Sequence, residues 1–298
     1  MSRKIQADLM LAACAVGWGG TFVVVKDALA DSSVFVFLAL RFVLAAVVLA
    51  AMQARAWRKI DGGLLRAGGL LGFLMFAGFA FQTAGLTLTT PSKSAFITGI
   101  LVVLVPLFLA AFGRKRIGRW IWAGVAAAVA GLYLLTVPVT GFSDLNLGDI
   151  LTLGCAALYA THIITISHYV PRYSSSLLVF VQVAATAVLS VAAVPLWSAA
   201  GWEAPRVVWT PGLIAAVVST AIVATVGTLL GQVWAQKYAP PSHVALILTL
   251  EPVSAAVISY FVEGERLGGR ALAGAALILA GILLAELKGG ATASAEPA

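Results

Sequence analysis

The sequence predicts an all-α integral membrane protein of ten transmembrane helices, arranged as two inverted five-helix repeats around a central cavity. Three observations lead to this fold class. Hydrophobic residues make up 61% of the chain and charged residues only 10%, so the chain cannot present a charged surface to water on all sides. The apolar residues form runs long enough to cross a bilayer as helices. The second half of the chain repeats motifs of the first half.

Ten apolar runs define the predicted spans in order. They cover residues 7–26, 33–52, 64–83, 94–112, 120–137, 149–166, 177–199, 211–236, 242–262 and 269–287. The polar connections between them are too short to hold a soluble domain, so we expect any function to reside within the helical bundle. The chain divides into a first repeat at 1–140, a second repeat at 141–288 and a Gly/Ala-rich tail at 289–298 that we expect to be disordered.

The net charge of +7 is distributed by loop. Basic residues are concentrated between spans two and three (Arg55, Arg58, Lys59, Arg66) and between spans four and five (Arg114, Lys115, Arg116, Arg119). Under the positive-inside rule this asymmetry places both termini in the cytoplasm, although Arg266 and Arg270 on the predicted outer side weaken it in the second half. We expect a multi-pass protein of the bacterial inner membrane, with the lipid bilayer and a small solute as partners and no nucleic acid. The first span lacks a convincing small-residue cleavage site, so we expect it to be retained.

The repeat is visible residue by residue. An offset of 141 aligns Asp8 with Asp149, Cys14 with Cys155, Trp18 with Tyr159 and Thr21 with His162. An offset of 150 aligns Gln82 with Gln232, Pro91-Ser92 with Pro241-Ser242, Gly124 with Gly274 and Gly131 with Gly281. Because each half has an odd number of spans, the two halves enter the membrane from opposite sides. Inverted repeats of this kind are typical of secondary transporters, in which two halves rock about a midplane site to give alternating access. A plain duplication with a structural role is the alternative.

Two matching polar faces are the candidate walls of a solute pathway. Helical spacing places Trp18 and Thr21 on one face of the first span, and Tyr159 and His162 on the equivalent face of the sixth. Polar side chains avoid lipid, so they face either a neighbouring helix or water. The alternative interpretation of each residue is that it forms a hydrogen bond between helices. The predicted substrate site consists of Trp18, Thr21, Phe79, Gln82, Tyr159, His162, Thr228 and Gln232. Aromatic walls with a few hydrogen-bonding groups suit an apolar amino acid.

Two ionisable residues fall near the middle of predicted spans, where a charge is costly unless it is paired or hydrated. Glu251 could carry a coupling proton or brace the helix that Pro252 interrupts. Arg41 could bind a substrate carboxylate, form a structural ion pair or snorkel. His162 could be a pH-responsive gate or a packing residue. Pro106 and Pro252 are candidate hinges, whereas the repeated glycines favour close helix packing.

Signatures of enzymes are missing. The chain has no Gly-x-Ser-x-Gly nucleophile motif, no Walker phosphate loop and no His-Glu-x-x-His metal pair, so we expect no enzyme activity, no cofactor and no metal. Cys14 and Cys155 lie inside spans and are interpreted as small packing residues. The rival interpretations are a channel and a polytopic membrane enzyme, the latter with His162 or His243 as base and Glu251 as acid.

Several short motifs, in order, resemble the EamA family of the drug/metabolite transporter superfamily. They are Trp-Gly-Gly-Thr-Phe at 18–22, Leu-Arg-Phe at 40–42, Pro106, Glu-Pro at 251–252 and Gly-Glu-Arg-Leu at 264–267 followed by Gly274 and Gly281. The first half departs from the pattern, because Gly-Arg-Lys-Arg-Ile stands at 113–117 where Gly-Glu-Arg-Leu would be favoured. The resemblance implies ten helices, a central cavity and export of small metabolites, often amino acids. We expect the transport to be a uniport or to be coupled to protons. Among its members, the chain most resembles exporters of aromatic and neutral amino acids.

Overall fold

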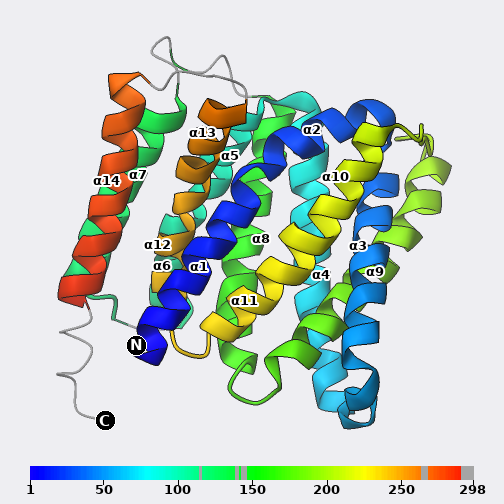
Figure 1. Ribbon diagram of the computed structural model, residues 1–298, viewed down its shortest axis with the longest axis horizontal. Coiled ribbons are helices and arrows are strands. Elements are labelled where there is room, and N and C mark those ends of the chain that lie inside the picture. Colours follow the sequence, from blue (N-terminus) through cyan, green and yellow to red (C-terminus); the bar gives the residue numbers. More distant parts are fainter. Residues whose placement is uncertain (114–115, 138–140, 142–145, 263–267, 290–298) are drawn as a thin grey trace.

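A computed structural model describes the chain except for residues 114–115, 138–140, 142–145, 263–267 and 290–298. Ten helical segments within the described residues are long and apolar enough to cross a membrane, which confirms the predicted fold class (Figure 1). Three features named above lie outside the described residues: the Gly-Glu-Arg-Leu motif at 264–267, the loop cations Arg114 and Lys115, and all of the predicted tail except residue 289.

The helices of the first half alternate in direction across the membrane. They are α1 (Arg3–Gly19), α2 (Thr21–Asp31), α3 (Val34–Gln53) with the 3-10 turn η1 (Ala54–Lys59), α4 (Gly62–Leu88), α5 (Pro91–Gly99), α6 (Leu101–Ala111) and α7 (Arg119–Thr136). In pairs, α1 with α2 and α5 with α6 each make one span. The first half therefore contains five spans.

The second half repeats this order. Its elements are α8 (Leu147–Tyr169), α9 (Ser175–Ala199), α10 (Pro211–Ala221), the π-helix η2 (Ile222–Gly227), α11 (Thr228–Ala235), α12 (Pro241–Leu248), α13 (Leu250–Val262), α14 (Gly269–Leu284) and the π-helix η3 (Ala285–Gly289). Here α10, η2 and α11 form one span, and α12 with α13 form another. Each predicted span coincides with one of these segments, with ends that differ by a few residues.

Local sequence explains where several helices begin. Asp61 accepts a hydrogen bond from the Leu64 backbone N–H and caps α4. Asn146 and Asp149 form a reciprocal capping box at the start of α8. The helices α5 and α10 each combine a threonine cap with proline in the first turn, where proline has no backbone hydrogen bond to lose. Capped starts fix where each span enters the bundle.

Three spans are interrupted near their middles. The first breaks at Gly20, between α1 and α2. The other two breaks are related by the repeat, since Ile100 separates α5 from α6 and Thr249 separates α12 from α13. Pro252 lies in the first turn of α13, directly after its break, whereas Pro106 lies inside the continuous helix α6. Only Pro252 therefore adjoins an interruption.

Glycine contacts hold the two halves together. A Cβ atom built on Gly131 would lie 2.6 Å from the Gly274 carbonyl oxygen, and one on Gly124 would lie 2.7 Å from that of Gly281. Only glycine permits this approach, so α7 and α14 touch along their backbones. The helix α4 packs against α8 and α9 of the second half, which interlocks the repeats.

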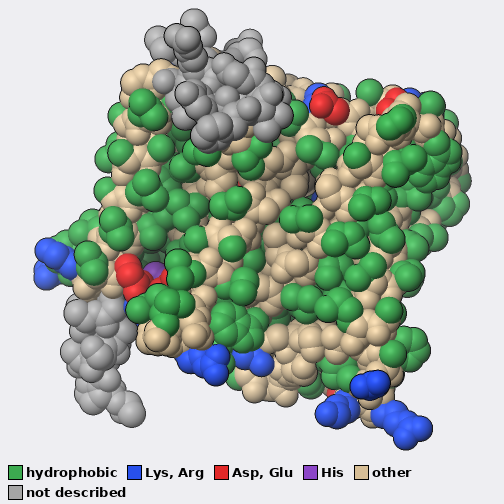
Figure 2. Space-filling view, in the orientation of Figure 1, with side chains coloured by type: hydrophobic (Ala, Val, Ile, Leu, Met, Phe, Trp, Pro, Cys, Tyr) green, Lys and Arg blue, Asp and Glu red, His purple; other side chains and the backbone are tan. Residues whose placement is uncertain are grey.

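The outer surface is apolar, as a lipid-facing surface requires. Figure 2 shows hydrophobic side chains over most of one face, with Lys and Arg gathered at its edges. Large exposed apolar residues include Val47, Leu65, Phe73, Val188 and Leu196. The helix α1 begins and α14 ends at the same end of the bundle (Figure 1), where Lys4 pairs with Glu286. We call this end the terminal face and the other end, where α4 ends and α5 begins, the far face.

Candidate functional site

A cavity lies at the centre of the bundle and is lined by helices of both halves. Its volume is about 100 Å³. Since one water requires roughly 10–15 Å³ of such space, the cavity has room for a small organic solute. Nine of the residues singled out from the sequence line it: Trp18, Thr21, Arg41, Phe79, Gln82, Tyr159, His162, Gln232 and Glu251. Apolar side chains such as Phe22, Met75 and Leu248 complete the walls.

The remaining predicted residues do not line this cavity. Thr228 is buried at the contact between α1 and α11, where its methyl group lies against Gly17. Pro252 borders a smaller neighbouring cavity of about 20 Å³. Pro106 is buried within α6. These three residues contact neighbouring helices, so any effect that they have on a bound solute would be indirect.

The π-helix η2 creates the most elaborate part of the wall. The Trp18 indole Nε1–H donates to the Ala224 carbonyl oxygen at 2.8 Å, and the Arg41 Nη2 donates to the same oxygen at 3.2 Å. Arg41 Nε also donates to Thr225 Oγ1 at 3.0 Å. A π-turn shifts backbone hydrogen bonds by one residue and commonly marks functional sites. Here it presents a carbonyl and a hydroxyl to two side chains of the first half.

Arg41 is a buried cation without a carboxylate partner in the described part of the chain. Its side chain is only 3% exposed and is held by neutral groups. The guanidinium carbon lies 4.5 Å from the centroid of the Phe79 ring, within the range of a cation–π interaction. These contacts stabilise the guanidinium but leave its positive charge uncompensated at the cavity.

Tyr159 and Gln82 form a polar chain across the cavity wall. The Tyr159 hydroxyl donates to Gln82 Oε1, and Gln82 Nε2 donates to Thr98 Oγ1, each at 3.4 Å. Both hydrogen bonds are long and therefore weak. Gly78 makes room for the Tyr159 ring, because a Cβ atom there would collide with it. The chain joins the third span to the sixth with groups that can exchange partners.

The His162 imidazole and the Gln232 amide differ in whether protein groups already occupy their hydrogen-bonding atoms. His162 Nε2 lies 3.0 Å from Gln182 Oε1 on α9, so one of its ring nitrogens is already hydrogen-bonded. Gln232 makes no side-chain hydrogen bond within the described residues, although it is buried at the cavity. Gln232 is therefore ready to hydrogen-bond a solute.

Glu251 supplies a carboxyl group to the same cavity. It lies in the first turn of α13, directly after the break at Thr249. It forms no ion pair with any residue that the structure describes. The backbone packs closely here, since a Cβ atom on Gly19 would lie 2.9 Å from the Glu251 carbonyl oxygen. A carboxyl group and a guanidinium, neither of which has an ion-pair partner among the described residues, thus line one cavity.

A second polar cluster lies outside the cavity, at the terminal face. Asp8, His243 and Glu286 each offer one ligand atom, and these atoms lie within 4.8 Å of one another, so this is a group that could hold a metal among the residues described. The Lys4 Nζ atom lies 2.5 Å from Oε1 of Glu286 and compensates the charge of that carboxylate. Lys4, which is not a member of the cluster, therefore balances part of its negative charge.

Sequence patterns missed two groups that shape the site. Ala224 acts through its backbone carbonyl, which no side-chain pattern can reveal. Thr225 lies in the eighth span, but its role as an acceptor for Arg41 depends on the π-turn. That turn has no counterpart at the equivalent place in α4, which is continuous. The repeat could therefore not predict it.

Ten membrane-spanning helices, an inverted repeat and a polar cavity between the halves define a membrane transporter. The profile of the EamA-like transporter family matches residues 5–137 and 146–287, and the chain belongs to this family. It is 34% identical over 286 residues to an uncharacterized transporter of Archaeoglobus fulgidus, covering 96% of this chain and 87% of the relative. It is 30% identical over 297 residues to a protein of Escherichia coli K12 named a probable amino-acid metabolite efflux pump, covering 95% of each.

A solved crystal structure supports the fold. It superimposes with a TM-score of 0.78 over 94% of this chain and 96% of that chain, at 20% sequence identity. At this identity the likeness concerns the arrangement of the helices alone.

Proposed function

We propose that this chain is a secondary transporter that exports neutral or aromatic amino acids, or similar small metabolites, by alternating access. The observation that carries the proposal is the pair Arg41 and Glu251. Both line the central cavity, and neither has an ion-pair partner in the described part of the chain. An amino-acid zwitterion carries the two complementary charges, a carboxylate for Arg41 and an ammonium for Glu251.

The walls between these charges favour an apolar side chain. Trp18, Phe22, Phe79 and Met75 supply aromatic and thioether surface around the cavity. Gln232 adds an amide whose hydrogen bonds are not taken by other described residues. Binding sites for small molecules commonly combine apolar walls with a few well-placed polar groups. This combination favours a neutral or aromatic amino acid over a sugar or a multiply charged metabolite.

The orientation of the chain in the membrane is part of the same proposal. The basic residues Arg55, Arg58 and Lys59 of η1 lie at the terminal face, since α3 runs toward it. The positive-inside rule then places this face, and both termini, in the cytoplasm of a bacterial inner membrane. We infer a carrier that is either a uniporter or coupled to protons, with Glu251 as the group that would bind the proton.

Counterflow in proteoliposomes tests this proposal. Vesicles preloaded with an unlabelled amino acid should accumulate the same labelled amino acid transiently, because a carrier exchanges solute through one site. A panel of neutral, aromatic, acidic and basic amino acids identifies the class, and an imposed pH gradient shows whether protons are coupled. Flux without counterflow would indicate a channel, and absence of any amino-acid flux would overturn the substrate class.

A further inference from the structure

Two contacts between an acidic and a basic side chain, related to each other by the repeat, join the first half to the second, one at each face of the bundle. At the terminal face, Lys4 and Glu286 also join the two halves. At the far face, Lys93 Nζ lies 2.6 Å from Asp149 Oδ2, with the two side chains only 5% and 1% exposed. Thr89 Oγ1 donates to Asp149 Oδ1 at 2.8 Å, and the Asn146 backbone N–H donates to Oδ2 at 2.9 Å. This buried pair ties α5 of the first half to α8 of the second.

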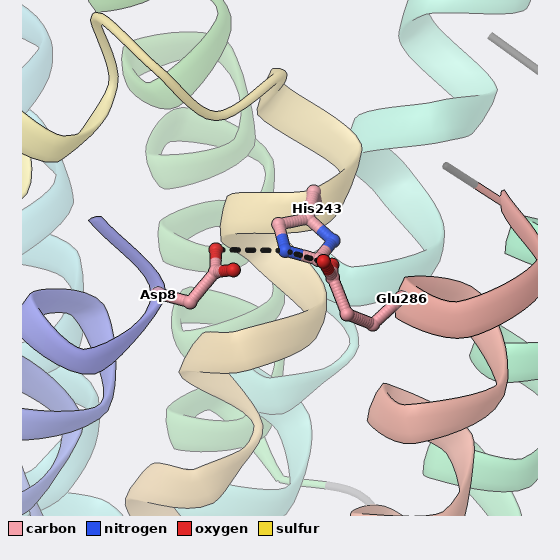
Figure 3. Close-up of side chains that lie close together, drawn as sticks. All are labelled: Asp8, His243 and Glu286. Carbon is pink, nitrogen blue, oxygen red and sulfur yellow. Dashed lines mark hydrogen bonds and ion pairs between the residues drawn. The ribbon is translucent and has the colours of Figure 1, made fainter. Parts of the chain in front are cut away.

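The second pair lies at the terminal face. His243 Nε2 lies 3.0 Å from Asp8 Oδ1 and ties α12 of the second half to α1 of the first (Figure 3). Glu286 Oε2 approaches the same nitrogen to 2.9 Å from the other side, as the close-up shows. At this face one nitrogen of His243 is shared by two carboxylates. At the far face, by contrast, both oxygens of one carboxylate, that of Asp149, have partners.

The repeat that relates the two halves also relates these two pairs to each other. The offset of 141 that aligns the two halves carries Asp8 onto Asp149, and the offset of 150 carries Lys93 onto His243. Each pair therefore joins the same two elements of the repeat, with the halves in reversed roles. Because the halves have opposite orientation, one contact lies at each face.

We propose that these two pairs are reciprocal gates, each of which must separate for the cavity to open to its own face. The inference rests on the proposed alternating access. Each gate is connected directly to the cavity, since α1 carries Trp18 and α8 carries Tyr159. The other partner of each gate, α5 or α12, ends at the break in its span, beside the cavity residues Thr98 and Leu248.

The two gates differ in their residues and in their exposure to solvent. The far-face gate pairs a carboxylate with lysine, and water is excluded from both side chains. The terminal-face gate pairs a carboxylate with histidine, and the Asp8 side chain is 21% exposed. Removing one member of a buried pair leaves an uncompensated charge and destabilises the fold. The test therefore neutralises both members of a gate together.

Accessibility of a cavity cysteine distinguishes gates from static clamps. A reporter Leu101→Cys is placed in a background with Cys14→Ala and Cys155→Ala, and is labelled with a membrane-impermeant methanethiosulfonate from either face of oriented vesicles. We expect Lys93→Gln with Asp149→Asn to raise labelling from the far face at least fivefold. Asp8→Asn with His243→Gln should raise labelling from the terminal face by a similar factor.

The conservative variant Asp8→Glu keeps a carboxylate facing His243 and should label like the reporter parent. Equal labelling of all variants from both faces, or the same change at both faces, would overturn the gates. If the far-face double variant does not fold, the partly exposed terminal-face pair decides the claim. Amino-acid counterflow of the parent is measured separately: its absence overturns the proposed function, whereas counterflow without a labelling change overturns only the gates.

Discussion

Trp18 and Arg41 donate hydrogen bonds to the same carbonyl oxygen, that of Ala224 in the π-helix η2. This shared acceptor joins the first and second spans to the eighth at the cavity wall. It explains how a guanidinium is held in a fixed position without a carboxylate partner among the described residues. The π-turn thus holds in place the guanidinium that we assign to substrate recognition.

Removing the hydroxyl that holds Arg41 should weaken substrate binding. In Thr225→Val the Arg41 Nε loses its acceptor, and an unpaired buried charged donor costs roughly 1–3 kcal/mol. We expect the half-saturation concentration in counterflow to rise about tenfold or more. The control is Ser219→Ala, an exposed hydroxyl of the same span that bonds only to the Ala216 carbonyl. Equal effects of both variants would contradict the role of Thr225.

The indole of Trp18 should contribute both area and a hydrogen bond. Trp18→Phe keeps an aromatic wall and loses the donor to Ala224, so we expect a reduction in transport of a few fold. Trp18→Ala also removes the apolar surface and should reduce transport at least tenfold. Initial rates of counterflow measure both. Normal transport by Trp18→Ala would remove this residue from the site.

The helix contact between α7 and α14 should not tolerate a methyl group. In Gly131→Ala the new Cβ would lie 2.6 Å from the Gly274 carbonyl oxygen, and overpacking of this kind costs about 1–3 kcal/mol. We expect a lower melting temperature of the protein in detergent. Gly69→Ala is the matched control, because nothing lies within 4 Å of its Cβ position. A melting temperature that falls equally in both would contradict close packing as the cause.

The two prolines should differ as hinges. Pro252 adjoins the interruption at Thr249, whereas Pro106 lies within a continuous helix. We expect Pro252→Ala to slow the counterflow rate several fold and Pro106→Ala to leave it nearly unchanged. The measurement is the maximal rate at saturating substrate, which reports conformational steps more than binding. If neither variant changes the rate, the hinge hypothesis fails.

The fold could be predicted from the sequence because lipid imposes simple rules on it. Span length, loop charge and the repeat offsets are local properties, and the glycine alignments at 124, 131, 274 and 281 correspond to real backbone contacts. Helical spacing also identified most of the residues that meet at the cavity, including Trp18 and Tyr159. These faces follow from periodicity alone.

Other parts of the site depend on contacts between distant segments. The position of Thr228 behind α1 depends on how closely Gly17 lets the helices approach. The break at Ile100 precedes Pro106 and has no proline of its own. The acceptors of the π-helix η2 meet Trp18 and Arg41, which come from two other spans. None of these follows from the pattern of a single span.

The central claim is that Arg41 recognises a substrate carboxylate and Glu251 an ammonium. The most direct measurement is competition by phenylalanine, its amide and its N-acetyl derivative against labelled substrate in counterflow, for the parent, Arg41→Gln and Glu251→Gln. The account predicts that the parent prefers phenylalanine at least tenfold over either analogue. Arg41→Gln should lose the preference over the amide alone, and Glu251→Gln the preference over the N-acetyl derivative alone. Unchanged preferences in both variants would contradict the claim.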